Sequence, residues 1–173
     1  MFAISWLGRF RHRHGFGVQS PWAYTFIRDV LMEKLPYYAF SQLASRFHAN
    51  DKRKRNQHRD EQLFRISQAL KPEQIIVIGE DVEVQKTYLM APQNNSDKSG
   101  MLLYMKSAED LTERWAEQAE GCTILVLDQI GSRQQRLWKQ IVADGRATST
   151  FDIRGYRGIA FFNQSRTKQH YKI

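Results

Sequence analysis

The sequence has little of what marks several large classes of protein. It contains a single cysteine, Cys122, among 173 residues, which excludes a disulfide bond within the chain. No apolar run approaches the ~20 residues of a membrane-spanning helix, and residues 1–10 lack the apolar length of a signal peptide. We therefore expect a cytoplasmic protein without a membrane span, whose cysteine is a buried structural thiol at the head of an apolar strand.

Signatures of hydrolytic and metal chemistry are missing as well. The sequence has no G-x-S-x-G element, and its five histidines are scattered. His12 and His14 stand two residues apart, but no cysteine, aspartate or third histidine accompanies them as a further ligand. We predict no catalytic residue and no metal ligand, and we interpret His170 as a surface residue of an edge strand.

Charge is unevenly distributed along the chain. The net charge is +8, and residues 1–60 hold 11 lysines and arginines against 4 acids. A basic front of this kind favours an anionic partner, either nucleic acid or a membrane surface. The alternative is a solvated segment that aids solubility, and the KRKR run within residues 48–59 has no interleaved aromatic residue on which bases would stack.

The segment Cys122–Trp138 organises the rest of the chain. Ile124–Leu127 is a run of four branched apolar residues, which is typical of a central parallel strand covered on both faces. Ser132 and Gln135 have the spacing of a capping box and predict the start of a helix. Asp128 lies between these elements, at the carboxyl end of the strand, where open α/β sheets bind their ligands.

Similar patterns predict the remaining elements. Ser20-Pro21 starts a helix, residues 48–59 form an exposed linker, and apolar spacing resumes in a helix over 60–70. Further strands are expected at Ile75–Ile78 and Met101–Met105, an antiparallel hairpin at Thr148–Ile153 and Gly158–Phe162, and core positions at Tyr88 and Trp115. The fold class is therefore α/β, with about five strands in a parallel core closed by an antiparallel hairpin. We place a basic helical extension and linker at 1–59 and the α/β domain at 60–173.

Three segments resemble one known group of proteins. They are HGFGVQSPWAYTFIRDVL, VLDQIGSRQQRLWKQI and the closing FDIRGYRGIAFFNQSRTKQHYKI. They resemble a bacterial O-methyltransferase-like group of the class I S-adenosylmethionine-dependent methyltransferases. The resemblance implies a Rossmann-like sheet and an S-adenosylmethionine site. If the cofactor still binds, its contacts here would be Gly79, Glu80, Asp81 and Asp128.

The cofactor loop departs from the pattern of that family. The family has a strand that ends in an acidic residue, followed by glycines at alternating positions before a helix. Aligned on Ile75–Met90, the acidic position is Val77, and only the first glycine remains, as Gly79. The next two glycine positions hold Asp81 and Glu83.

These substitutions remove the physical basis for binding the cofactor at this loop. A helix N-terminus attracts a carboxylate through its free N–H groups and its partial positive charge. Glu80, Asp81 and Glu83 would cap that end with their own carboxylates and repel an anionic ligand, at about 1 kcal/mol for each like-charge contact near the surface.

Two further departures concern length and metal ligands. Family members have two more strands in the interval that Ala91–Gly100 spans here, and one of those strands supplies the acid that holds the ribose. Metal-dependent members have acids at the ends of the next two strands. The corresponding residues in this sequence are Tyr104-Met105-Lys106 and Asp128-Gln129, which leave one carboxylate.

Three functions remain open from the sequence. The first is a degenerate methyltransferase-like protein that is inactive and acts as a binding or regulatory partner. It would bind a protein, or a second copy of itself, through a sheet edge exposed beside Ile75–Ile78 or Met101–Met105. The second is an active, reduced O-methyltransferase acting on an unknown small molecule. The third is nucleic-acid or anionic-surface binding through the basic N-terminal part.

Overall fold

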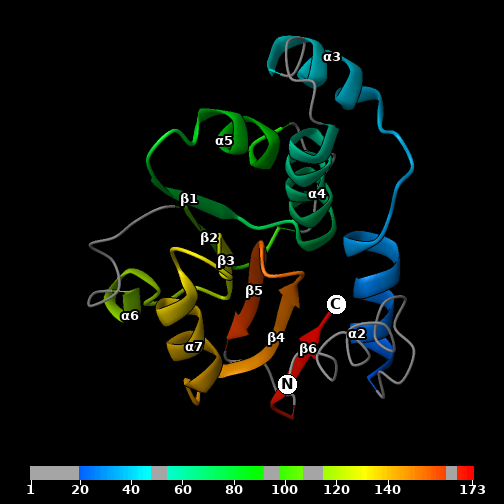
Figure 1. Cartoon of the computed structure of the whole chain (residues 1–173). Coiled ribbons are helices and arrows are strands. Elements are labelled where there is room, and N and C mark those ends of the chain that lie inside the picture. The colour runs from blue at the N-terminus through cyan, green and yellow to red at the C-terminus, as the bar shows by residue number, and fades with distance from the viewer. Residues whose placement is uncertain (1–19, 48–53, 92–97, 107–114, 163–166) are drawn as a thin grey trace. The chain divides into compact units, whose positions relative to one another are not determined.

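The computed structural model describes residues 20–47, 54–91, 98–106, 115–162 and 167–173 (Figure 1). These residues fall into two compact units. The sheet unit contains the described parts of 72–80 and 99–173, and the helical unit contains those of 14–71 and 81–98. None of the helices within these ranges is long and apolar enough to cross a membrane.

The sheet unit is built on one mixed sheet. Its strands are β1 (Gln74–Gly79), β2 (Met101–Lys106), β3 (Ile124–Asp128), β4 (Ala147–Ile153), β5 (Arg157–Phe162) and β6 (Gln169–Lys172), and its described helices are α6 (Trp115–Gln118) and α7 (Gln135–Ala143). The strand order is β1-β2-β3-β5-β4-β6. The first three strands are parallel, and β5 runs antiparallel between β3 and β4. The predicted parallel core and closing hairpin are confirmed.

The sheet has six strands, one more than the sequence indicated. β6 pairs in parallel with β4, from Ser149↔Gln169 to Asp152↔Lys172. Only Tyr171 of this strand is buried, so its sequence has no apolar run that would announce a strand. β6 joins the sheet because it pairs with β4, a strand that is distant in sequence, and not because its own residues are apolar.

One face of the sheet is covered by α7. Leu103, Met105, Leu125 and Leu127 of the central strands form a core cluster with residues that include Leu137, Trp138 and Ile141 of α7 and Trp115 and Cys122. Full burial of each large apolar side chain contributes about 1.5–3 kcal/mol. Trp115 and Cys122 are buried as predicted.

A glycine permits the closest contact in this core. A Cβ atom at Gly158, in β5, would lie 2.6 Å from ring carbons of Trp138. Any side chain at position 158 would therefore force the indole away from the sheet. Glycine in a strand usually weakens it, but Gly158 allows α7 to pack closely against β5.

The capping box predicted at Ser132 is wrong. α7 begins at Gln135 with Gln134 as its N-cap, and the Ser132 hydroxyl donates instead to the carbonyl oxygen of Gln129, 3.3 Å away. The reason lies in the preceding loop, where the amide of Gly131 donates to the carbonyl of Gly155 at 2.6 Å. Because this bond ties the loop to the β4–β5 turn, the helix starts later than the local signal indicates.

The helical unit consists of α2 (Pro21–Phe26), the π-helical turn η1 (Ile27–Leu31), α3 (Tyr38–Phe47), α4 (Lys54–Leu70) and α5 (Glu83–Leu89). The predicted start of α2 is confirmed, because the amide of Ala23 donates to the Ser20 hydroxyl at 3.3 Å and Pro21 is the first helical residue. α4 is held to its neighbours by buried polar contacts. Ser67 Oγ donates to the carbonyl of Leu89 at 2.6 Å, and Gln62 Nε2 donates to that of Leu31 at 2.9 Å.

The linker expected at 48–59 is wrong over residues 54–59, which form the first turns of α4. Residues 48–53 lie outside the described ranges. Within α4, Gln57 Nε2 donates to Oε1 of Glu61, one turn further along, at 2.8 Å. This hydrogen bond links the polar first turns of the helix to the turns that follow. The domain boundary expected between residues 59 and 60 thus falls inside α4. The two compact units instead divide the described chain at 71/72, 80/81 and 98/99.

Aromatic residues attach α3 to α4. Phe40 is buried, and its ring centroid lies 5.2 Å from that of Phe64 in an edge-on contact. The Tyr37 ring lies 5.3 Å from that of Phe64, and the guanidinium of Arg65 lies 5.0 Å from the centre of the Phe40 ring. The buried Tyr88 of α5 belongs to this unit and occupies a core position as predicted.

Candidate functional site

The carboxyl ends of β1, β2 and β3 meet at one edge of the sheet. In register, Gly79 lies beside Lys106, and Met105 lies beside Leu127, the residue before Asp128. This is the edge at which open α/β sheets bind ligands. Gly79 and Asp128 are the last residues of β1 and β3, and Glu80 directly follows Gly79.

Asp128 is engaged by two side chains of the sheet unit. Arg157 Nε donates to its Oδ1 at 2.6 Å, and Arg157 Nη2 donates to its Oδ2 at 3.0 Å. The Tyr104 hydroxyl donates to the same Oδ2 at 2.8 Å. Both carboxylate oxygens therefore accept hydrogen bonds from the protein itself.

The guanidinium in this pair is removed from water. The side chain of Arg157 has no exposed surface, and that of Asp128 is 16% exposed. Burial alone would lower the pKa of Arg157, but the charge of Asp128 and its hydrogen bonds raise that pKa above its ordinary value. A buried cation of this kind requires its partner, because an unpaired buried charge costs several kcal/mol.

The pair follows from strand register. Asp128 is the last residue of β3, and Arg157 is the first residue of β5. The antiparallel ladder sets them directly opposite each other, while Tyr104 comes from β2 on the other side of β3. Sequence reasoning missed Arg157 and Tyr104. The available signal was an arginine at the head of a strand that is otherwise fully apolar.

Gly79 has a structural role that needs no ligand. Its φ angle is +136°, and a Cβ atom built on it would lie 1.9 Å from the carbonyl oxygen of Lys106. Only glycine fits this close approach of the ends of β1 and β2. The glycine that aligns with the family loop is thus required by packing within the sheet.

The other loop residues are separated between the two units. Glu80 is exposed and ends the β1 segment of the sheet unit, whereas Asp81 is exposed and begins a segment of the helical unit. The expectation that acids cap the following helix is wrong, because α5 has Val82 as its N-cap with no side-chain hydrogen bond. Glu83 lies in the first turn, where its charge is favourable to the helix.

Other chemistry-bearing residues are used in packing. Burial raises the pKa of the Cys122 thiol, whose Sγ lies within hydrogen-bonding distance of the carbonyl of Ile124. His170 Nδ1 lies 2.8 Å from the hydroxyl of buried Thr150, and partial burial together with Lys172 lowers the pKa of this imidazole. Within the described ranges, no group of three or more His, Cys, Asp or Glu is arranged to hold a metal ion.

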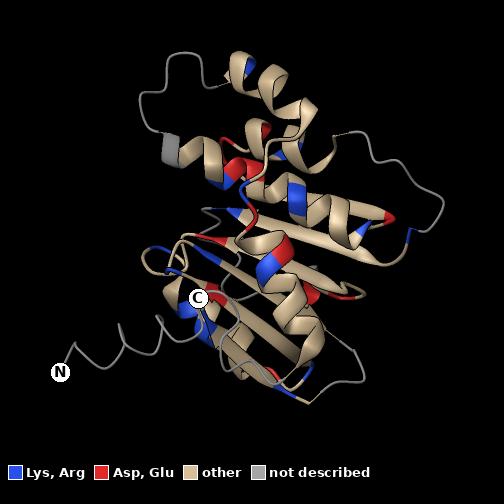
Figure 2. Cartoon of the chain, turned by 90° about the vertical axis from the view of Figure 1, so that its right-hand side faces the viewer, with Lys and Arg blue, Asp and Glu red and all other residues tan. Residues whose placement is uncertain are grey.

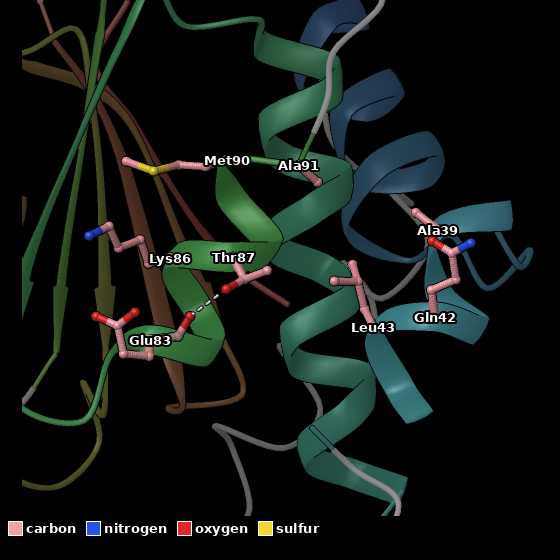
Figure 3. A pocket seen from close by; sticks show the side chains of 8 residues that line it. All are labelled: Ala39, Gln42, Leu43, Glu83, Lys86, Thr87, Met90 and Ala91. Atoms are coloured by element: carbon pink, nitrogen blue, oxygen red, sulfur yellow. Dashed lines mark hydrogen bonds between the residues drawn. The ribbon is translucent and has the colours of Figure 1, made fainter. Parts of the chain in front are cut away.

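A groove of about 400 Å³ lies between α3 and α5 of the helical unit (Figure 3). Its lining residues are Ala39, Gln42, Leu43, Glu83, Lys86, Thr87, Met90 and Ala91. In the view of Figure 3, the long side chains of Glu83, Lys86 and Met90 extend from α5 on the side away from α3. The Thr87 hydroxyl donates to the carbonyl of Glu83 at 2.8 Å. The groove therefore has no converging set of polar groups among its lining residues.

Part of the basic front predicted from the sequence falls outside the described ranges. Arg9, Arg11 and Arg13 lie within residues 1–19, and Lys52 and Arg53 lie within 48–53. Nucleic-acid or anionic-surface binding through this part of the chain therefore stays a prediction.

No protein-family model, no curated protein and no solved structure matches the chain.

Proposed function

We propose that this chain is a degenerate methyltransferase-like protein that does not transfer methyl groups and acts by binding another protein. The observation that carries the proposal is the state of Asp128. Its carboxylate, at the ligand-binding edge of the sheet, is bonded to the buried guanidinium of Arg157 and to the Tyr104 hydroxyl. An acid committed in this way holds the fold together and leaves little capacity to bind a cofactor.

The resemblance to methyltransferases is supported by the strand arrangement. A parallel core, β1 to β3, is followed by the antiparallel pair β4 and β5, as the resemblance implies. Among the described residues, this arrangement lacks the two further strands of the family, one of which supplies the ribose-binding acid. The strand order resembles that of the family, while the residues that would contact the cofactor are missing. This combination favours an inactive methyltransferase-like protein over a protein unrelated to the family.

Gly79 supports the same conclusion. In an active reduced enzyme, this glycine would let the backbone approach the cofactor. Its contact with the carbonyl of Lys106 accounts for the glycine without a ligand. The two family-matched residues of the sheet unit, Gly79 and Asp128, thus both have structural explanations.

The binding role rests on the position of β1. It is one of the two terminal strands of the sheet, while β2 lies between β1 and β3. The expected edge beside Met101–Met105 is therefore wrong, and of the two edges expected from the sequence the one beside Ile75–Ile78 lies at the end of the sheet. Backbone groups along a strand edge are a template for a further strand.

Thermal unfolding with and without cofactor tests the proposal. A ligand that binds the native state at 100 times its Kd stabilises it by about 2.7 kcal/mol. We expect millimolar S-adenosylmethionine or S-adenosylhomocysteine to leave the unfolding temperature unchanged. A rise in Tm that saturates with either compound, and that adenosine does not reproduce, would contradict the proposal.

A further inference from the structure

We propose that the free edge of β1 receives an extended strand of a different polypeptide, uncharged over about six residues and flanked by lysine or arginine. This inference rests on the proposed binding function and names the chemistry of the partner. It is carried by the contrast between the two edges of the sheet, by the orientation of the β1 backbone and by the charges at the ends of β1.

The two edge strands are protected differently. β6 has four residues, carries the exposed side chains of His170 and Lys172, and follows the exposed Lys168. Charged residues and short length are the usual devices that prevent unwanted pairing at a sheet edge. β1 has six residues, QIIVIG, without a charge or a proline. In Figure 2 the strands are drawn mostly in tan, with charged residues near their ends.

The β1 backbone presents hydrogen-bonding groups away from β2. The amide of Gln74 points toward β2, where it donates to the carbonyl of Gly100 at 3.4 Å. Because successive residues of a strand alternate, the amides of Ile75 and Val77 face the opposite side. Within the described ranges, no strand pairs with β1 on that side. These groups are suited to bond an added strand.

The side chains of β1 would also be better covered by such a strand. Ile76 and Ile78 pack against the core cluster beneath α7 but remain partly exposed. Ile75 and Val77, on the other face, are half-buried. A neighbouring strand would bury more of all four side chains.

Charge decides which kind of strand fits. Glu73 precedes β1, Glu80 follows it, and both are exposed. In an antiparallel pair of two copies, Glu73 of each copy would lie near Glu80 of the other. In a parallel pair, each acid would lie near its own equivalent. Either arrangement sets like charges side by side, whereas a segment with lysine or arginine at its ends is complementary.

The test uses the full chain and two synthetic peptides. Each has the uncharged core Thr-Val-Thr-Val-Thr-Val, flanked on both sides by two lysines in one peptide and by two glutamates in the other. Hydrogen exchange of the β1 amides reports pairing, and fluorescence anisotropy reports affinity. We expect the lysine-flanked peptide to slow exchange at Ile75 and Val77 and to bind at least about tenfold more tightly than the glutamate-flanked peptide.

Variants of the chain separate edge pairing from non-specific attraction. Val77→Pro removes the central outward amide and should abolish protection by the peptide, whereas Val77→Thr keeps the amide and should retain it. The double variant Glu73→Lys and Glu80→Lys should reverse the preference between the peptides. Circular dichroism of each variant confirms that it is folded. Equal binding of the two peptides to the unmodified chain would overturn the inference.

Other occupants give distinguishable results. Protection of Ile75 and Val77 in the peptide-free monomer would show that the chain covers its own edge. Protection that rises with protein concentration as a homodimer or head-to-tail oligomer forms would assign the edge to a second copy. Either result overturns a heterologous partner. The unfolding measurement with S-adenosylhomocysteine, made on the same sample, shows separately whether the proposed function stands.

Discussion

Asp128 and Arg157 form a two-point ion pair, with Arg157 Nε 2.6 Å from Oδ1 and Nη2 3.0 Å from Oδ2 of Asp128. The pair joins the end of β3 to the start of β5 and includes a guanidinium with no exposed surface. In this protein, the acid at the carboxyl end of β3 is thus held in an internal salt bridge.

Removing the charge of Asp128 should destabilise the protein strongly. Asp128→Asn leaves the guanidinium of Arg157 buried without a counter-charge, which costs about 3–5 kcal/mol. We expect a loss of this size in the free energy of unfolding measured by urea denaturation. An active enzyme that used Asp128 mainly for cofactor contacts would lose affinity with little loss of stability.

Asp144 provides a matched control. Its Oδ2 lies 2.9 Å from Arg146 Nη2, but the side chain of Arg146 is 45% exposed. Asp144→Asn should therefore cost less than about 1 kcal/mol. Equal losses for Asp128→Asn and Asp144→Asn would show that burial of Arg157 has no energetic consequence.

The structural role of Gly79 can be tested without any ligand. Gly79→Ala sets a methyl group against the carbonyl of Lys106 and forces a side chain into a backbone conformation with φ of +136°. We expect a loss of about 2 kcal/mol or more in the free energy of unfolding. Gly145→Ala is the control, because a Cβ atom there meets no atom within 4 Å. Similar stabilities for the two variants would remove the packing explanation.

Stability should fall at alkaline pH through Cys122. Burial raises the pKa of this thiol in the folded protein, so the folded state holds its proton after the unfolded chain has released it. The contribution of Cys122 is complete below its unfolded pKa of about 8.5 and is lost as pH rises through the folded value. The Cys122→Ala variant should show a shallower decline between about pH 8 and pH 10 in urea titrations. An identical decline in both proteins would contradict this assignment.

The strands and the hairpin could be predicted because their evidence is local. Ile124–Leu127 and Ile75–Ile78 are short runs of apolar branched residues, a pattern typical of strands. The start of α2 was equally local, since Ser20 and Pro21 supply both the cap and the first helical residue. Each of these features is determined by residues adjacent in sequence.

The missed features depend on contacts between distant segments. The partner of Asp128 is 29 residues away in sequence, and only the register of β3 against β5 brings Arg157 opposite it. The start of α7 is delayed by a bond between Gly131 and Gly155. Local composition indicated that Asp128 lies at an important edge but did not show which side chain it would meet there.

The most direct test of the central claim is a calorimetric titration of the chain with S-adenosylhomocysteine. If Asp128 is committed to Arg157 and Tyr104, the titration should show no binding heat at millimolar ligand. Saturable micromolar binding, about −8 kcal/mol, that Asp128→Asn abolishes in a variant still folded at low temperature would contradict the account. It would mean that this edge of the sheet remains a cofactor site.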